Sequence, residues 1–163
     1  MNQLPDRKQV RDLFEGLLGR DVTISDGSPV EPGAALGPLV GVYVDDHTTL
    51  SAVVLMEFRL AAYVGAALGL VPKGGAEAAG EDRELPPMLA ENAAEVLNVL
   101  AAPIGDASGV HQRLYQTVVP GEAIPGDAAA WAVRLGNRTD LLLDVKSYGA
   151  GTLSIVSALV DPS

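Results

Sequence analysis

A chain of 163 residues, of which 48% are apolar and 20% charged, has the composition of one globular domain, residues 1–163, with a sizeable core. Its net charge of −10 repels phosphate backbones and anionic lipid, so nucleic acid and membrane surfaces are poor candidate partners. The absence of cysteine excludes a disulfide framework, thiolate chemistry and metal sites of the Cys type.

The sequence predicts a soluble, cytoplasmic protein. Residues 1–20 are charged and periodic and lack the apolar core of a secretory signal. Residues 52–71 are long and apolar, but Glu57 and Arg59 interrupt them, and each would cost roughly 2.5–3.5 kcal/mol at the centre of a bilayer. We therefore interpret this segment as a buried strand followed by a buried helix.

Apolar periodicity predicts a helix and then strands in the first third of the chain. Residues 6–18 carry an apolar stripe at i, i+3, i+4, i+7 and i+8, which is typical of a helix. The β-branched run 21–25 predicts a strand, and the Gly- and Pro-rich segment 27–38 predicts a loop. The apolar runs 39–45 and 49–56, separated by three turn residues, predict a hairpin.

The middle of the chain predicts two helices. Residues 58–70 are apolar nearly all round, with Gly65 allowing close packing. Residues 73–83 consist largely of Gly, Ala and Glu and predict a mobile connector. Residues 86–103 begin with two prolines, which suit a first helical turn, and we expect the helix to end at its last proline and a turn to follow at 105–109.

The last third predicts strands. Residues 111–119 alternate in part, and runs at 131–135, 141–145 and 153–157 are separated by turn residues, which favours a three-stranded meander. Helices and strands are segregated along the chain, so we predict an α+β fold: two long helices packed on a mostly antiparallel sheet, with an additional N-terminal helix. No strong repeat is present, although the order of elements leaves room for a degenerate duplication.

The helix at 86–103 separates into two faces. At about 100° per residue, Glu91, Glu95 and Asn98 lie together within an arc of roughly 60° and should face solvent. Polar residues face outward on most surface helices, so this spacing alone assigns no function. The opposite face should be buried, and it carries the apolar residues Leu89, Ala93, Val96, Leu97 and Leu100.

The pattern Glu91-x-x-x-Glu95-x-x-Asn98 resembles the signature of the CheC/CheX/FliY phosphatases of bacterial chemotaxis. The order of elements around it also resembles a single CheX-type domain, over most of the chain. Two features depart from the family pattern. The first position is usually Asp or Ser, and a Gly commonly follows soon after the Asn, where residues 99–102 are Val-Leu-Ala-Ala here.

The resemblance implies a hydrolase that acts on the phosphoaspartate of a CheY-type response-regulator receiver domain. In that case Asn98 and Glu95 would be the catalytic residues: Asn98 would orient the attacking water, and Glu95 would pair with a lysine of the receiver. Glu91 would belong to the partner-binding surface. The protein would need no cofactor or metal of its own, because the Mg²⁺ is expected on the receiver domain.

Two alternatives remain open beside the phosphatase. The acidic face of the helix could dock a receiver without hydrolysing anything, and the departures from the family pattern favour this interpretation. The protein could also be a dimeric scaffold in which exposed strand edges of the meander pair between chains. CheX-type proteins dimerise through their sheets, so a homodimer is compatible with either activity.

Overall fold

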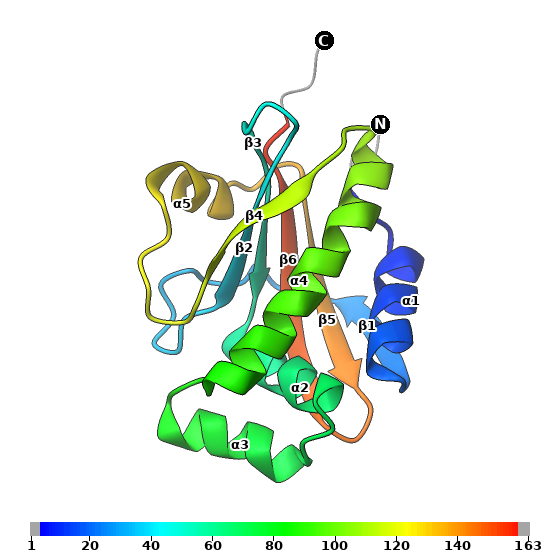
Figure 1. Cartoon of the computed structure of the whole chain (residues 1–163), viewed down its shortest axis with the longest axis vertical. Helices are drawn as coiled ribbons and strands as arrows, with labels where there is room; N and C mark the ends of the chain where they lie inside the picture. The colour runs from blue at the N-terminus through cyan, green and yellow to red at the C-terminus, as the bar shows by residue number, and fades with distance from the viewer. Residues whose placement is uncertain (1–3, 160–163) are drawn as a thin grey trace.

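Six strands form one open antiparallel sheet with the order β1-β5-β6-β3-β2-β4 (Figure 1). The computed structural model describes residues 4–159. The central pair is β3 with β6, and the two edge strands are β1 and β4. The strands are β1 (Val22–Asp26), β2 (Leu39–Val44), β3 (Leu50–Met56), β4 (Arg113–Val118), β5 (Arg138–Val145) and β6 (Gly149–Ser157).

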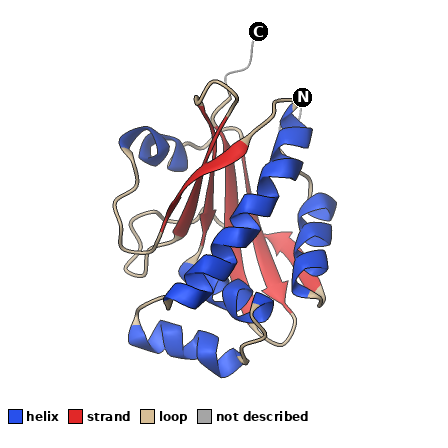
Figure 2. Ribbon diagram, in the orientation of Figure 1, coloured by secondary structure: helices blue, strands red, loops and turns tan. Residues whose placement is uncertain are grey.

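Five helices accompany the sheet within residues 4–159, and their residues explain where they lie (Figure 2). Three of them bury apolar stripes in one large core on the same face of the sheet, and a short helix packs on the other face over a smaller core. The helices over the larger core are α1 (Arg7–Leu18), α2 (Phe58–Leu68) and α4 (Pro87–Ser108). The short helix over the smaller core is α5 (Gly126–Ala132). Helix α3 (Lys73–Asp82) packs against α2.

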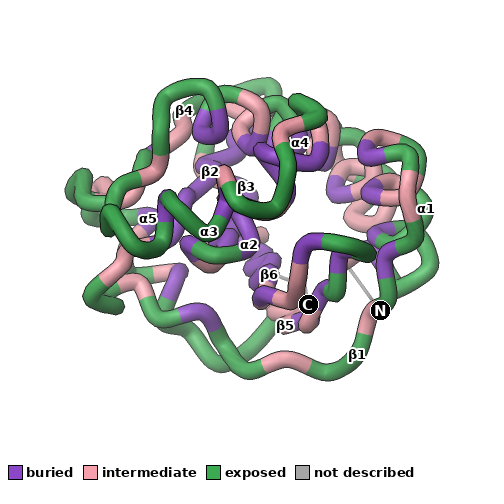
Figure 3. Tube along the Cα trace, turned by 90° about the horizontal axis from the view of Figure 1, so that it is seen from below, coloured by how far each residue is buried: buried purple, intermediate pink, exposed green. Residues whose placement is uncertain are grey.

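The strands alternate between the two cores. In β2, Leu39 and Tyr43 enter the larger core, whereas Val40 and Val42 enter the smaller one. Figure 3 shows buried residues gathered between the helices and the strands, with exposed residues along the outer loops. The predicted α+β fold, with its N-terminal helix and with α2 beside α4 over an antiparallel sheet, is confirmed.

Three local predictions are wrong, and each error has a physical cause. Residues 73–83 are not a mobile connector, because Ala76 and Ala79 bury against α2 and make the segment helical. The motif helix does not end at Pro103: it continues to Ser108, because Leu100 and Ile104 remain in the core on either side of the proline. The helix ends instead at Gly109, whose φ of 75° suits a left-handed cap.

The third error concerns the predicted meander. Residues 131–135 are not a strand; Trp131 lies at the end of α5, half-buried against the smaller core. The meander is therefore a hairpin of β5 and β6, and both strands lie inside the sheet. The predicted dimer edges consequently cannot come from these strands, because only β1 and β4 have an unpaired side in the described sheet. No helix within residues 4–159 is long and apolar enough to cross a membrane.

Candidate functional site

The outer face of α4 carries an exposed stripe of five residues with helical spacing. Glu91, Glu95 and Asn98 form its middle, as the sequence predicts, and all three are exposed. Met88 and Ala102 extend the stripe by one turn at either end. The predicted inner face is buried, including Val96 and Leu97. The structure therefore brings the three predicted site residues together on one surface.

The three polar side chains of the stripe have no internal partner. Within residues 4–159, none of Glu91, Glu95 and Asn98 makes a side-chain hydrogen bond or an ion pair with another residue. Asn92, one position from Glu91, behaves differently: its Nδ2 donates to the carbonyl oxygen of Gly65 at 3.1 Å. Two carboxylates and one carboxamide thus remain available to a partner, and the surface they form is negatively charged.

The helix that carries the stripe is held closely against α2. A Cβ atom on Gly65 would lie only 2.3 Å from the carbonyl oxygen of Leu89, so glycine alone permits this contact between the two backbones. The hydrogen bond from Asn92 meets α2 at the same residue. The N-terminal half of the stripe is fixed at this crossing.

A second contact fixes α4 to the sheet directly below Asn98. The Tyr43 hydroxyl of β2 donates to the carbonyl oxygen of Leu97 at 2.5 Å, and the tyrosine is fully buried. Burial raises the pKa of Tyr43, which keeps the hydroxyl protonated as a donor. Tyr43 is a residue of the site that the sequence pattern does not predict. The available signal was a phenolic hydroxyl in an otherwise apolar strand, which requires a buried partner.

The sheet order relates α4 to α1. Exchanging β1, β2 and β3 with β4, β5 and β6 gives the order β1-β5-β6-β3-β2-β4 again, read in reverse. Each half of the chain therefore contains a helix, a strand and a hairpin in that order, with α2 and α3 added after the first hairpin and α5 inserted in the second half. The counterpart of α4 is therefore α1 and not α2. The duplication for which the sequence left room had another form, a strand pair and a helix followed by a helix and strands.

The two related helices differ in how their outer charges are used. On α1, the charged side chains pair with one another: Lys8 Nζ lies 2.8 Å from Asp12 Oδ2, and Arg11 Nε lies 3.9 Å from Glu15 Oε1. On α4, the carboxylates of the stripe have no cation beside them in the described part of the chain. The site on α4 consequently has no equivalent on α1.

No protein-family model matches the chain, and no curated protein matches it in sequence. Solved structures match over nearly the whole chain. The FliM middle domain from H. pylori has a TM-score of 0.64 at 8% identity, covering 92% of this chain and 83% of that one. A chemotactic CheC-like protein from Shewanella oneidensis MR-1 has a TM-score of 0.53 at 13% identity, covering 92% and 93%.

A third match comes from a CheX-CheY-BeF3-Mg²⁺ complex of Borrelia burgdorferi, with a TM-score of 0.55 at 13% identity, covering 91% of this chain and 92% of that chain. These similarities concern the fold, which is that of the CheC/CheX/FliY proteins and of the FliM middle domain. The fold implied by the sequence motif is confirmed, and the roles of Glu91, Glu95 and Asn98 stay predictions.

Proposed function

We propose that this chain is a CheX-like phosphatase that hydrolyses the phosphoaspartate of a CheY-type receiver domain in bacterial signal transduction. The observation that carries the proposal is the stripe on α4, in which a glutamate and an asparagine are exposed and unpaired within the described residues. A similar fold in a complex of CheX with CheY supports a receiver as the partner.

The chemistry needs one positioned water. The Asn98 carboxamide holds this water in line with the phosphorus, the new P–O bond forms, and the bond to the aspartyl oxygen breaks. The carboxylate of the receiver leaves, and inorganic phosphate is released. Glu95 pairs with a lysine of the receiver, Glu91 adds a second carboxylate to the docking surface, and the Mg²⁺ belongs to the receiver.

The attachment of α4 supports this use of its outer face. Positioning groups must be held to about half an ångström, which a rigid element does better than a loop. The Gly65–Leu89 crossing fixes one part of α4, and the Tyr43 hydroxyl holds the backbone one residue before Asn98. The carboxamide is therefore carried by a backbone with little freedom to move.

A specific observation favours a second candidate, a docking or scaffold module without catalysis. The FliM middle domains have higher TM-scores, 0.64 and 0.61, than the CheX and CheC-like structures. FliM structures of this fold include complexes with FliG and with SpeE. In this candidate the stripe on α4 binds a partner, and Asn98 has no chemical step to perform.

Decay of a phosphorylated receiver separates the two candidates. Receiver domains from the same organism are phosphorylated with acetyl phosphate, and their decay and binding are followed with the parent, Asn98→Ala and Glu95→Ala. We expect Asn98→Ala to slow the accelerated decay roughly 10²-fold with binding nearly unchanged, because an orienting group acts in the transition state. Glu95→Ala should weaken binding by about tenfold, and less at high salt.

Asp144→Ala is the control, because this exposed carboxylate alternates along β5 with Leu143 and Val145 of the larger core and so lies on the other face of the sheet from α4. It should leave both measurements unchanged. If the parent binds a receiver without hastening its decay, the docking module is the correct function. If Asn98→Ala leaves an accelerated decay untouched, the phosphatase mechanism is wrong.

A further inference from the structure

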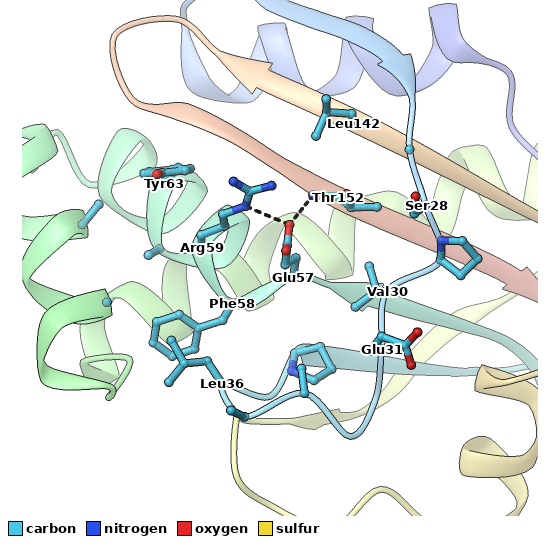
Figure 4. Close-up of a pocket in the computed structure, with 18 of the residues that line it drawn as sticks. Ser28, Val30, Glu31, Leu36, Glu57, Phe58, Arg59, Tyr63, Leu142 and Thr152 are labelled. Atoms are coloured by element: carbon cyan, nitrogen blue, oxygen red, sulfur yellow. Dashed lines mark hydrogen bonds and ion pairs between the residues drawn. The ribbon is translucent and has the colours of Figure 1, made fainter.

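A broad groove of about 1170 Å³ lies between the loop that joins β1 to β2, the first turns of α2, and α3 (Figure 4). We call it the α2–α3 groove. It is separate from the stripe on α4, since Glu91, Glu95 and Asn98 do not line it. Its walls are largely apolar, with contributions from Val30, Leu36, Phe58, Tyr63, Ala76 and Leu142.

The size of the groove fits a peptide segment better than a metabolite. Sites for small molecules usually enclose roughly 300–1,000 Å³, and this groove exceeds that range. Figure 4 shows Phe58 beside Leu36 on one side of the groove and Tyr63 on the same helix one turn further on. An apolar trough between helices is the usual acceptor for the apolar face of another helix.

The charged residues around the groove indicate which charge a bound partner should carry. Five carboxylates and two guanidinium groups line the groove: Asp26, Glu31, Glu57, Glu77 and Glu81, with Arg59 and Arg83. Arg7 pairs with Asp26 and Lys73 pairs with Glu77, so including these two neighbouring cations leaves a formal excess of one negative charge. This excess favours cationic over anionic side chains in an occupant.

Some of these carboxylates are already paired and others are not. Glu57 Oε1 accepts hydrogen bonds from Arg59 Nε at 3.0 Å and from the Thr152 backbone N–H at 2.9 Å. Glu31 and Glu81, by contrast, have no side-chain hydrogen bond or ion pair within residues 4–159. These two exposed carboxylates are available to cations of a bound partner.

The two walls of the groove are held in different ways. The loop wall is held where the Val30 backbone N–H donates to Ser154 Oγ at 3.0 Å. Helix α3, which forms the other wall, contains Gly74 and Gly80, of which Gly80 lines the groove, and a Cβ at either position would meet no atom within 4 Å. Packing therefore does not require these glycines, and each lowers the stability of the helix.

We propose that the α2–α3 groove binds a basic amphipathic helix of a protein partner. The apolar face of this helix contacts the partly exposed side chains of Leu36, Tyr63 and Leu142, and its lysines or arginines lie against Glu31 and Glu81. The walls of the groove consist mainly of side chains and therefore offer few backbone groups to a bound segment. The bound segment must satisfy its own backbone hydrogen bonds, as a helix does. This surface adds a second partner site to the one on α4.

The test uses a fluorescent peptide of about 14 residues, or four helical turns, built from Leu and Lys in an amphipathic helical pattern. A peptide of the same composition, scrambled to remove the pattern, is the control probe. Anisotropy should show saturable binding of the first peptide only. Glu31→Lys combined with Glu81→Lys should weaken binding by about tenfold or more.

Asp106→Lys combined with Asp144→Lys changes the net charge equally at exposed positions outside the groove and should bind within about twofold of the parent. Peptide binding should also slow hydrogen exchange in α3. Equal losses in the two double variants, equal binding of the scrambled peptide, absence of saturable binding, or protection confined to α4 would each overturn the proposal.

Discussion

Leu97 and Asn98 are neighbours on α4 and have opposite environments. Leu97 is buried and its carbonyl oxygen accepts the Tyr43 hydroxyl, whereas the Asn98 side chain is exposed and unpaired among residues 4–159. The site therefore depends on two sides of α4: the buried side attaches the helix to the sheet, and the exposed side can bind a partner. Substitutions on the two sides should have different consequences.

Val96→Asp should unfold or strongly destabilise the protein. The Val96 side chain is 0% exposed in the larger core, and an unpaired carboxylate buried there costs several kcal/mol. That cost is comparable with the roughly 5–15 kcal/mol that stabilises a typical domain. Thermal melting measures the effect, with Ala102→Asp on the exposed stripe as the control. A melt of Val96→Asp that matches the parent would place Val96 outside the core.

Tyr43→Phe should lower the free energy of unfolding modestly. It should have a larger effect on how accurately α4 positions Asn98. The change removes the hydroxyl that donates to Leu97, and a buried hydrogen bond contributes about 0.5–1.5 kcal/mol. We expect urea denaturation to show this decrease in the free energy of unfolding. The variant should also dephosphorylate the receiver more slowly while binding it with unchanged affinity. Tyr115→Phe, at an exposed tyrosine, should change neither quantity. Weaker receiver binding by Tyr43→Phe would contradict a role limited to positioning.

At the scale of elements, local signals predict those features that depend on neighbours in the chain. The helical spacing of Glu91, Glu95 and Asn98 is local, so their common exposed face could be predicted. The bond between Tyr43 and Leu97 joins residues 54 positions apart, so no local pattern contains it. The tertiary core also overrides local signals at Pro103, where buried Leu100 and Ile104 carry the helix past the proline.

Burial of small side chains explains the remaining errors. The glycines of α3 predict a loop, but Ala76 and Ala79 bury against the core and the segment is helical. In α5 the same is true of Ala128 and Ala132 against the smaller core. Both helices depend on the surface beneath them, so both should be sensitive to changes in intrinsic helix stability.

Replacing glycines in α3 tests this dependence. Gly74→Ala and Gly80→Ala should each stabilise α3 by about 1 kcal/mol, because neither added methyl group meets an atom within 4 Å. Native-state hydrogen exchange of the α3 amides should slow accordingly. Gly65→Ala is the contrasting variant and should be strongly destabilising, since its Cβ would lie 2.3 Å from the Leu89 carbonyl oxygen. Unchanged exchange in α3 would show that its helix is limited by packing alone.

At the scale of the whole molecule, two related halves surround the β3–β6 pair. The halves leave different edges at the two ends of the sheet. The β1 edge is short and polar, with Thr23, Ser25 and Asp26 exposed, and Asp26 pairs with Arg7. The β4 edge carries two exposed apolar side chains, Tyr115 at 56% and Val119 just beyond the strand at 37%. Arg113 and Gln116 are also exposed on this edge, and Tyr115 lies at a bulge in the pairing with β2. The backbone groups of β4 that have no partner in the described sheet favour pairing with another strand.

We therefore expect a homodimer in which β4 pairs with β4 of a second copy to form a continuous sheet. Because the pairing is isologous, each exposed apolar side chain contributes twice, once from each copy. Light scattering after size exclusion gives the mass of the assembly. Tyr115→Lys combined with Val119→Lys places charges along the edge, which opposes strand pairing, and should give a monomer.

Val133→Lys combined with Leu135→Lys removes two other exposed apolar side chains, at 62% and 88% exposure, and adds the same charge away from the edge. This control should remain dimeric. If both variants are monomeric, general surface hydrophobicity and not the β4 edge holds the copies together. If the parent is monomeric at high concentration, the predicted dimer is wrong. A dimer formed at β4 leaves one stripe of α4 on each copy, so dissociation by the edge variant should leave the activity per chain unchanged.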